Sequence, residues 1–565
     1  MAALFTTPKR NDKTSGAHFI EPDMHRRTLL AHGSWRRVTR RIVCGLACAL
    51  TVSSLLMPSV SLAAEWVDVG GTQYNAGTAA GDEAGTWSWD GADDMKLNGY
   101  DGGAIKAEGK LNIAYEGKNT VKTEPDYTGA AIKAQDGTNQ KAELNITSSN
   151  STDELNVTAE ADAIKSTGDL SITGSGTVNA TGGTEGIQSK GKTTIDSSGT
   201  VIAKGGEGYG VAAGSDIIIK GGGKVEASSI EEAAIWADGS INISDGSQVE
   251  ASSQGDLAVD AEGSLAVTNA SLDASGVEYG VYAYKGVTLD HATVTVRTSA
   301  SGGQAIALIT DGDDIVIKNG SIVDAFAEGK FSVAISTRNH QPNVAGGHIY
   351  ISDSVVKAIA RYVETGGDGP DCYSTDQDGE ITPERRGVNI GIYAQTTEGI
   401  MPATISIVRS KVTAEGDTAA IFALAMSTDG KAIGTIEIEG ASILTPEGGK
   451  VIDYRHKEEL SNGIMYEAGQ VIGTGDAVID SPYDDVIAKK AVIAPSEETK
   501  PEDSKPDSKP EGTKATKTVA VAATGAKTTG KLAATGDASS AAIVAAALTG
   551  TAAIAAGAVV SRKRS

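Results

Sequence analysis

The feature that most constrains the fold is a repeat of 22 to 25 residues that runs from Met95 to Leu444. Each copy contains three short apolar pieces separated by Gly, Ser, Asn or Asp. The first piece is centred on one aliphatic residue, and its copies include Ile164, Ile187, Val211, Ile235, Val259, Val281 and Ile306. A repeat of this length is typical of solenoids, in which each copy packs only on its neighbours.

The second piece alternates apolar and polar residues, which is the pattern of a strand with one buried face. Its apolar pairs are Leu111/Ile113, Leu144/Ile146, Leu170/Ile172, Ile217/Ile219, Ile241/Ile243, Leu265/Val267, Val287/Leu289, Ile315/Ile317, Ile349/Ile351, Ile405/Ile407 and Ile436/Ile438. The third piece carries one large apolar residue, with copies at Val178, Val201, Val225, Val249, Leu272, Val294, Ile322, Val412 and Ile443.

Strands this short do not form stable sheets alone. We therefore predict an all-β fold, a parallel β-helix or β-solenoid, in which each piece lies on its copy one coil away. Ile172, Ile195, Ile219 and Ile243 should line up in a central column. An array of immunoglobulin-type sandwiches would not repeat this three-part pattern. Low-complexity disorder would not keep Ile and Val in register.

Composition fits a thin, repetitive core. The chain of 565 residues contains 69 glycines and is 4% aromatic. Its formal net charge of −24 argues against a nucleic-acid partner, because phosphate binding needs clustered Lys and Arg. Cys372 is the one cysteine that remains if the leader is removed, so no intrachain disulfide can stabilise the mature chain.

The N-terminus predicts export. Residues 1–64 have the order of a secretory signal peptide: four arginines between residues 36 and 41, an apolar run from Ile42 to Val60, and small residues ending at Ala64. The sequence leaves open the true start codon and the route, Sec or twin-arginine.

The C-terminus has three segments in a fixed order. Residues 495–530 are polar and rich in Pro, Lys and Asp, which predicts a disordered linker. Within residues 531–565, the pentapeptide Leu532-Ala533-Ala534-Thr535-Gly536 precedes an apolar segment from Ala538 to Val560 and a basic end. The apolar segment is long enough for a transmembrane helix.

This tripartite end resembles the LPXTG-type sorting signal of Gram-positive cell-wall proteins, and its Leu-Ala-x-Thr-Gly form is similar to the one read by class E sortases of actinobacteria. The resemblance implies that a sortase cleaves between Thr535 and Gly536 and passes the acyl group to a peptidoglycan precursor. Membrane contact would then occur only through the sorting signal before cleavage. A plain C-terminal membrane anchor is the alternative.

The repeat region resembles right-handed parallel β-helix surface proteins with carbohydrate-binding or pectin-lyase-like repeats. Thr86-Trp87-Ser88-Trp89-Asp90-Gly91 is similar to the beginning of such domains. We place an N-terminal cap at 65–100, the repeats at 101–455 with an insertion at 364–386, and a C-terminal cap at 456–494.

In a strand, the residue after an inward one points outward. The row of outward residues next to the first-piece aliphatics is the candidate binding face. The row begins with Lys106, Lys133 and Lys165, a basic ladder that could pair with acidic sugars. Farther along the row, Trp236 and Tyr282 are two coils apart, which places them roughly 10 Å from each other on one face. Aromatic rings at that spacing can stack on sugar rings. The row continues through Gln188, Ala212, Asp260, Ala307, Tyr393 and Phe422. Scattered surface residues without a function are the alternative.

Two acidic segments were candidates for chemistry. Asp313 and Asp314 resemble the paired aspartates of polygalacturonases, in which two carboxyl groups act as acid and base, but the partner motifs are missing apart from a partial match at Gly346-Gly347-His348. A turn before the strand at Ile315 is the favoured interpretation. The insertion 364–386 resembles a calcium loop but has Arg385 where a bidentate Glu is needed. We predict no metal site and no cofactor.

The leading prediction is a non-enzymatic, secreted protein covalently attached to the cell wall, acting as an adhesin or carbohydrate-binding module for a host or environmental glycan. A polysaccharide-active enzyme of pectin-lyase-like or polygalacturonase-like type is the second hypothesis. A passive structural spacer is the third.

Overall fold

The structure is a computed structural model. It describes residues 64–125, 127–137, 141–339, 347–363, 389–396, 403–417, 419–427, 435–447, 456–459, 465–468, 470–473 and 490–495. All of these residues belong to the first of two units, Met1–Glu498 and Thr499–Ser565. The predicted signal peptide up to Ala63, the insertion 364–386, the linker beyond Pro495 and the sorting signal 531–565 lie outside the described residues.

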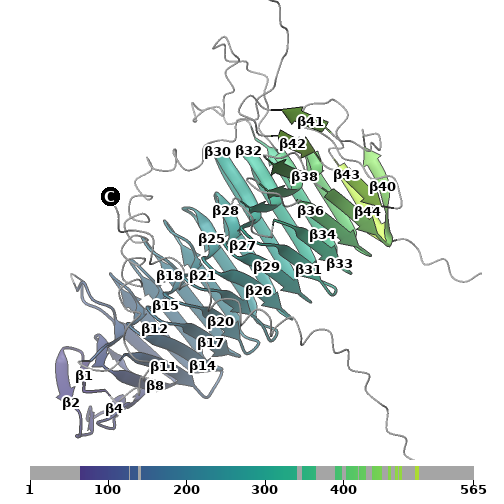
Figure 1. Cartoon of the computed structure of the whole chain (residues 1–565). Helices are drawn as coiled ribbons and strands as arrows, with labels where there is room; N and C mark the ends of the chain where they lie inside the picture. The colour runs from purple at the N-terminus through teal and green to yellow at the C-terminus, as the bar shows by residue number, and fades with distance from the viewer. Residues whose placement is uncertain are drawn as a thin grey trace, which may run out of the picture. The chain divides into compact units, whose positions relative to one another are not determined.

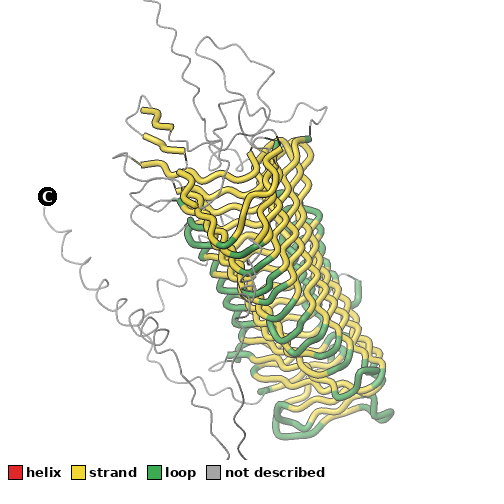
Figure 2. Tube along the Cα trace, turned by 90° about the vertical axis from the view of Figure 1, so that its right-hand side faces the viewer, coloured by secondary structure: helices red, strands yellow, loops and turns green. Residues whose placement is uncertain are grey.

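Every regular element in the described ranges is a β-strand, so the all-β prediction is confirmed. Figures 1 and 2 show strands stacked in parallel columns along one direction, consistent with a β-solenoid. In the described part of the chain, no helix is long and apolar enough to cross a membrane. The predicted transmembrane helix at 538–560 falls outside that part.

The second piece of each copy forms a sheet of sixteen strands. The first two strands, β3 (Ala80–Gly81) and β4 (Trp87–Trp89), pair antiparallel with each other, and β4 pairs antiparallel with β5. The remaining strands are parallel: β5 (Asp94–Asn98), β8 (Lys110–Glu116), β11 (Glu143–Ser148), β14 (Asp169–Gly174), β17 (Thr193–Ser197), β20 (Ile217–Lys220), β23 (Ile241–Ile243), β26 (Ser264–Thr268), β29 (Gly286–Asp290), β31 (Ile315–Lys318), β33 (Ile349–Ser352), β36 (Thr404–Val408), β39 (Thr435–Glu439) and β43 (Gln470–Gly473).

The first and third pieces form two ladders of a second sheet. The first-strand ladder contains β7 (Ile105–Glu108), β10 (Ile132–Gln135), β13 (Ile164–Ser166), β16 (Ile187–Ser189), β19 (Val211–Ala213), β22 (Ile235–Ala237), β25 (Leu257–Ala261), β28 (Tyr279–Ala283), β35 (Asn389–Thr396) and β38 (Ala419–Ser427). The third-strand ladder contains β9 (Lys118–Lys122), β12 (Glu154–Ala159), β15 (Thr177–Gly182), β18 (Thr200–Gly205), β21 (Lys224–Ser229), β24 (Gln248–Ser253), β27 (Ser271–Gly276), β34 (Val355–Tyr362), β37 (Lys411–Gly416) and β40 (Ala441–Glu447). The long strands β30 (Thr293–Asp311) and β32 (Ile322–Asn339) belong to both ladders and join them.

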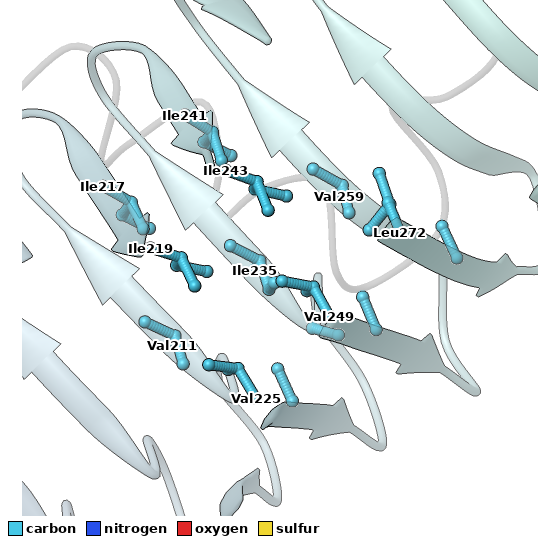
Figure 3. Close-up of a cluster of buried hydrophobic side chains, with 14 of the residues drawn as sticks. Val211, Ile217, Ile219, Val225, Ile235, Ile241, Ile243, Val249, Val259 and Leu272 are labelled. Atoms are coloured by element: carbon cyan, nitrogen blue, oxygen red, sulfur yellow. The ribbon is translucent and has the colours of Figure 1, made fainter. Parts of the chain in front are cut away.

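The predicted central column is confirmed. Ile172, Ile195, Ile219 and Ile243 are successive partners in the sixteen-stranded sheet, and each is 1% exposed. Figure 3 shows Ile219 and Ile243 beside the inward residues of the first and third strands, such as Val211 and Val225. Because each aliphatic residue packs on its copy in the next coil, the column removes nearly all of this apolar surface from water.

The inward orientation predicted for two residues, Ile322 and Ile306, is wrong. In the third-strand ladder, Val294 pairs with Val323, while Ile322 points outward and is 52% exposed. The cause is the corner before the strand: Gly320 follows the left-handed residue Asn319 (φ 56°) and adds one residue to the turn. In the first-strand ladder, Val281 pairs with Leu308 and not with Ile306.

The second error has a similar cause. β30 contains extra residues between its third-strand and first-strand parts, and its pairing with β32 has an irregularity between Ala300 and Gln304. Ile306 and Leu308 are equally apolar, so the sequence alone did not indicate which one faces the column. The outward residue of this coil is consequently Ile309, and the predicted Ala307 is a buried core residue.

Both ends of the described coils carry antiparallel strands. At the N-terminal end, β1 (Trp66–Val69) pairs antiparallel with β2 (Thr72–Asn75) and with β7. At the other end, β42 (Met465–Ala468) pairs antiparallel with β38 and with β41 (His456–Glu459), and β44 (Lys490–Pro495) pairs antiparallel with β37 and β40. Such pairings cover open sheet edges, which otherwise invite association with other chains.

Candidate functional site

The outward face of the first-strand ladder contains the predicted binding residues in one continuous row. Lys106 pairs with Lys133, and Lys133 pairs with Lys165, so the three lysines lie on adjacent coils. All three are half-buried. Lys165 forms an ion pair with Asp162 at 2.5 Å, and the Lys106 ammonium lies 4.7 Å from the centre of the Tyr127 ring.

Lys133 is the central member of this lysine row. Burial and the positive charges of Lys165 and Lys106 lower the pKa of its ammonium group. Among the described residues, no carboxylate forms an ion pair with Lys133. Like charges stacked on neighbouring strands are destabilising, so this arrangement carries an energetic cost that folding alone does not require.

Six other lysines of the strands are arranged differently, because each forms an ion pair with a carboxylate on a neighbouring strand. The N–O distances are 2.9–3.8 Å, and the pairs are Lys110–Glu143, Lys118–Glu154, Lys220–Asp196, Lys224–Glu250, Lys318–Asp290 and Lys357–Asp324. Lys133 differs from these six lysines, because it faces a lysine on both neighbouring strands.

Asp162 lies at the corner that precedes the row and is 6% exposed. Burial opposes its ionisation, but hydrogen-bond contacts with Glu185, Lys165 and Thr184 outweigh burial and lower its pKa to about 2. The Thr184 hydroxyl donates to Oδ1 at 2.6 Å. Asp162 neutralises Lys165, and Lys106 lies opposite Asp68 of β1, so Lys133 is the cation of the row that faces no acid on either neighbouring strand.

The aromatic part of the row begins at Trp236, four strands after Lys133 in the first-strand ladder. Trp236, Asp260 and Tyr282 are successive partners, as the sequence predicted. Trp236 is half-buried and stacks on Tyr209, with ring centroids 5.1 Å apart and planes at 15°. Tyr209 therefore covers one face of the indole ring, and only the remaining exposed part of Trp236 could contact a sugar.

Tyr282 packs edge-on against Tyr279, with ring centroids 5.8 Å apart. Its hydroxyl donates to Oδ2 of Asp311 at 3.1 Å. Burial, above all, raises the pKa of Tyr279 to about 12, and burial together with Asp311 also raises the pKa of Tyr282. Both phenols stay protonated at neutral pH and can act as hydrogen-bond donors.

Sequence reasoning missed Tyr209 and Tyr279. Both lie two residues before an inward residue, at the corner where the third strand passes into the first strand. A strict alternation would place that position inside, but the bend of the chain turns it outward. The signal that could have found it is the recurrence of large residues at this offset: Tyr209, Leu257, Tyr279, Ile306, Val333 and Ile390.

Beyond Tyr282 the outward row becomes apolar and buried. The successive partners are Ile309, Ser336, Tyr393 and Phe422, and the Tyr393 and Phe422 rings stack 5.7 Å apart at 13°. Tyr393 is 5% exposed and Phe422 is 3% exposed. Ile309, Tyr393 and Phe422 belong to a second hydrophobic cluster outside the central column, separate from the candidate contacts at Lys106, Lys133, Lys165 and Trp236.

Asp314 is part of a repeated structural contact. Its Oδ1 accepts a hydrogen bond from the backbone N–H of His348 in the next coil at 3.0 Å, and His348 Nδ1 accepts one from the N–H of Thr404. Asp169 and Asp216 accept from the next coil in the same way. This supports the interpretation of Asp313 and Asp314 as turn residues.

Three carboxylates at the N-terminal end also lie close together: the ligand atoms of Asp90, Asp93 and Asp94 are within 4.8 Å of one another. Asp90 accepts hydrogen bonds from the N–H groups of Ala92 and Asp94, and Asp94 accepts one from the Asn112 amide. The contacts of Asp90 hold the turn between β4 and β5, and the contact of Asp94 joins β5 to β8. The absence of a metal site stays a prediction.

Comparison with protein-family models, with curated proteins and with solved structures finds no match to the chain.

Proposed function

We propose that this chain is a secreted surface protein of a Gram-positive bacterium, attached to peptidoglycan through Thr535, and that its solenoid binds acidic glycans at the lysine row. The order of segments at the two termini supports the attachment. The coils would wind right-handed, because connections between parallel strands of one sheet almost always do. Residues beyond Pro495 would form the linker and the transmembrane sorting helix.

The observation that carries the glycan proposal is the stacking of Lys133 between Lys106 and Lys165, with no ion pair to Lys133 among the described residues. Six lysines elsewhere in the sheets pair with an acid on a neighbouring strand, whereas Lys133 faces two lysines. Adjacent coils are about 4.8 Å apart, so a chain of uronate or sulfated sugars lying along the ladder could place an anionic group near each ammonium. Charge-assisted hydrogen bonds of this kind are stronger than neutral ones.

Titration calorimetry tests the glycan proposal on the ectodomain, residues 65–498, with oligogalacturonate as the acidic ligand and a cello-oligosaccharide as the neutral one. We expect binding of the acidic ligand only, weakened about tenfold by Lys133→Gln, which corresponds to about 1.4 kcal/mol, and weakened further by salt. Lys118→Gln removes a lysine that is paired with Glu154 and serves as the matched control.

Equal binding of both ligands, or unchanged affinity in Lys133→Gln, would refute the lysine row as the site. If no glycan on a broad array binds, the passive spacer becomes the better hypothesis.

Cell fractionation tests the attachment. Muramidase treatment of the wall should release the protein with peptidoglycan fragments bound to the Thr535 carboxyl group. Deletion of residues 532–536 should abolish that linkage and leave the protein in the membrane or in the medium. A wall fraction without the protein would contradict the proposed attachment but would leave the glycan proposal intact.

A further inference from the structure

The third-strand ladder is interrupted near the C-terminal end of the described coils. β34 and β37 pair directly and in parallel. Among the described strands, the next third strand, β40, pairs with β44 and not with β37. β44 lies between the two and is antiparallel to both, with Ile493 opposite Val412 on one side and Ile443 on the other. β44 thus occupies a gap between two coils.

The gap exists on one face only. In the sixteen-stranded sheet the same two coils pair directly, β36 with β39, with Ile405 opposite Ile436. The coils therefore separate by the width of one strand at β37 and β40, and the main chain of these two strands depends on β44 for its hydrogen bonds. A backbone group buried without a partner is costly, so an empty gap would be unfavourable.

β44 fits the gap by its side chains as well as its backbone. Ala491 and Ile493 are 3% and 1% exposed and join the central column, whereas Val492 and Ala494 on the opposite face are half-buried. Lys490 Nζ lies 3.1 Å from Oε1 of Glu415 on β37, and Glu415 also pairs with Arg361. The Lys490–Glu415 ion pair joins the beginning of β44 to its register partner on β37.

β44 lies directly before the predicted C-terminal linker in the chain. Residues 474–489 separate β44 from β43, and the predicted linker and sorting signal follow directly after Pro495. Any load on the tail of an attached protein would act first on β44. Non-covalent contacts along the two edges of β44, with β37 and with β40, keep it in the solenoid.

We propose that the gap between β37 and β40 is a strand-binding site and that β44 is a detachable strand, which ties the C-terminal tail to the solenoid. In such a site the main-chain hydrogen bonds supply affinity, and the pockets for alternate side chains supply specificity. Ile493 is the principal side-chain determinant. The proposal depends on neither the glycan nor the wall linkage.

A cleavage experiment on the full chain tests the proposal. A protease site is introduced between Ser481 and Pro482, the folded protein is cleaved, and native gel filtration follows the fragment that contains β44. We expect this fragment to co-elute with the solenoid and to be displaced by an excess of a peptide of residues 488–498. Ile493→Asp should reduce the retained fraction at least tenfold, whereas Val492→Asp, on the opposite face, should retain it.

Circular dichroism before cleavage establishes that each variant is folded. If Ile493→Asp does not fold, Ile493→Ala provides the comparison, and its fragment should dissociate faster than that of wild type. Separation of the wild-type fragment immediately after cleavage would show that β44 is not held by the gap. Retention despite excess peptide would show that the strand is not detachable. Either result overturns the proposal.

Discussion

The two faces of the first-strand ladder differ although they belong to the same strands. The inward face repeats one kind of residue, as in Ile164, Val211 and Leu308, all at most 1% exposed. The outward face changes along the ladder, from lysines through Trp236 to the buried Phe422. The inward residues fix the stacking register, because each must fill the same column. The outward residues have no such common requirement, so their differences can serve functions and local packing.

The largest expected effect comes from placing a charge in the column. Ile219→Lys should cost roughly 4 kcal/mol or more of the free energy of unfolding, because a buried ammonium would have no partner. Ile218→Lys, on the same strand and half-buried on the outward face, should cost less than about 1 kcal/mol. Thermal unfolding of the two variants measures the difference. Similar melting temperatures would contradict the assigned register.

A smaller loss is expected in the outer hydrophobic cluster. Phe422→Ala should cost about 3 kcal/mol, because it removes a buried ring that stacks on Tyr393. Tyr350→Ala removes a ring that is 38% exposed and should cost less than about 1 kcal/mol. Denaturant unfolding compares the two variants. An equal loss would mean that the outer cluster contributes no more than an ordinary surface residue.

The next effect is a pH dependence at the corner before the lysine row. The pKa of Asp162 is lowered to about 2, so its contribution is present above the ordinary value of 3.8 and is lost as pH falls through the folded-state value. Its size is on the order of 2 kcal/mol. Asp162→Asn should remove this part of the acid dependence between pH 4 and 2, as measured by unfolding at each pH. Asp273→Asn, an exposed residue, is the control for loss of an acidic side chain. Matching acid profiles for Asp162→Asn and wild type would contradict the assigned ion pair.

The smallest expected effect is a gain in stability on replacing Lys133. Burial and neighbouring lysines lower the pKa of Lys133, so its protonated form is less favourable in the folded chain than in the unfolded chain. Lys133→Gln should therefore raise stability near neutral pH by about 0.5 kcal/mol while it weakens binding of an acidic glycan. The stability difference should diminish as pH rises and Lys133 deprotonates. A loss of stability in this variant would show that the stack is structural rather than a binding site.

The sequence predicted the inward face of the coils more completely than the outward face. Alternation identified the column and the register of Lys106, Lys133 and Lys165, because a side-chain period of two leaves one choice once the buried face is known. Alternation failed at Ile322 and Ile306. At each site a nearby residue, Val323 or Leu308, is equally apolar, and the length of the preceding corner decides which one faces the column. Alternation could not show that Tyr209 covers Trp236, because that contact forms at a bend, where alternation no longer holds.

The sequence by itself determined the all-β class, the three-part coil and the identity of most column residues, because these depend on local periodicity and on the burial of aliphatic side chains. It also supplied every argument for export and wall attachment, which stay predictions. Only the tertiary structure decided that Lys133 lacks an acidic partner among the described residues, that Asp314 accepts a hydrogen bond from His348 in the next coil, and that β44 enters the ladder between β37 and β40. Each of these depends on residues brought together from distant coils, and no local pattern encodes such contacts.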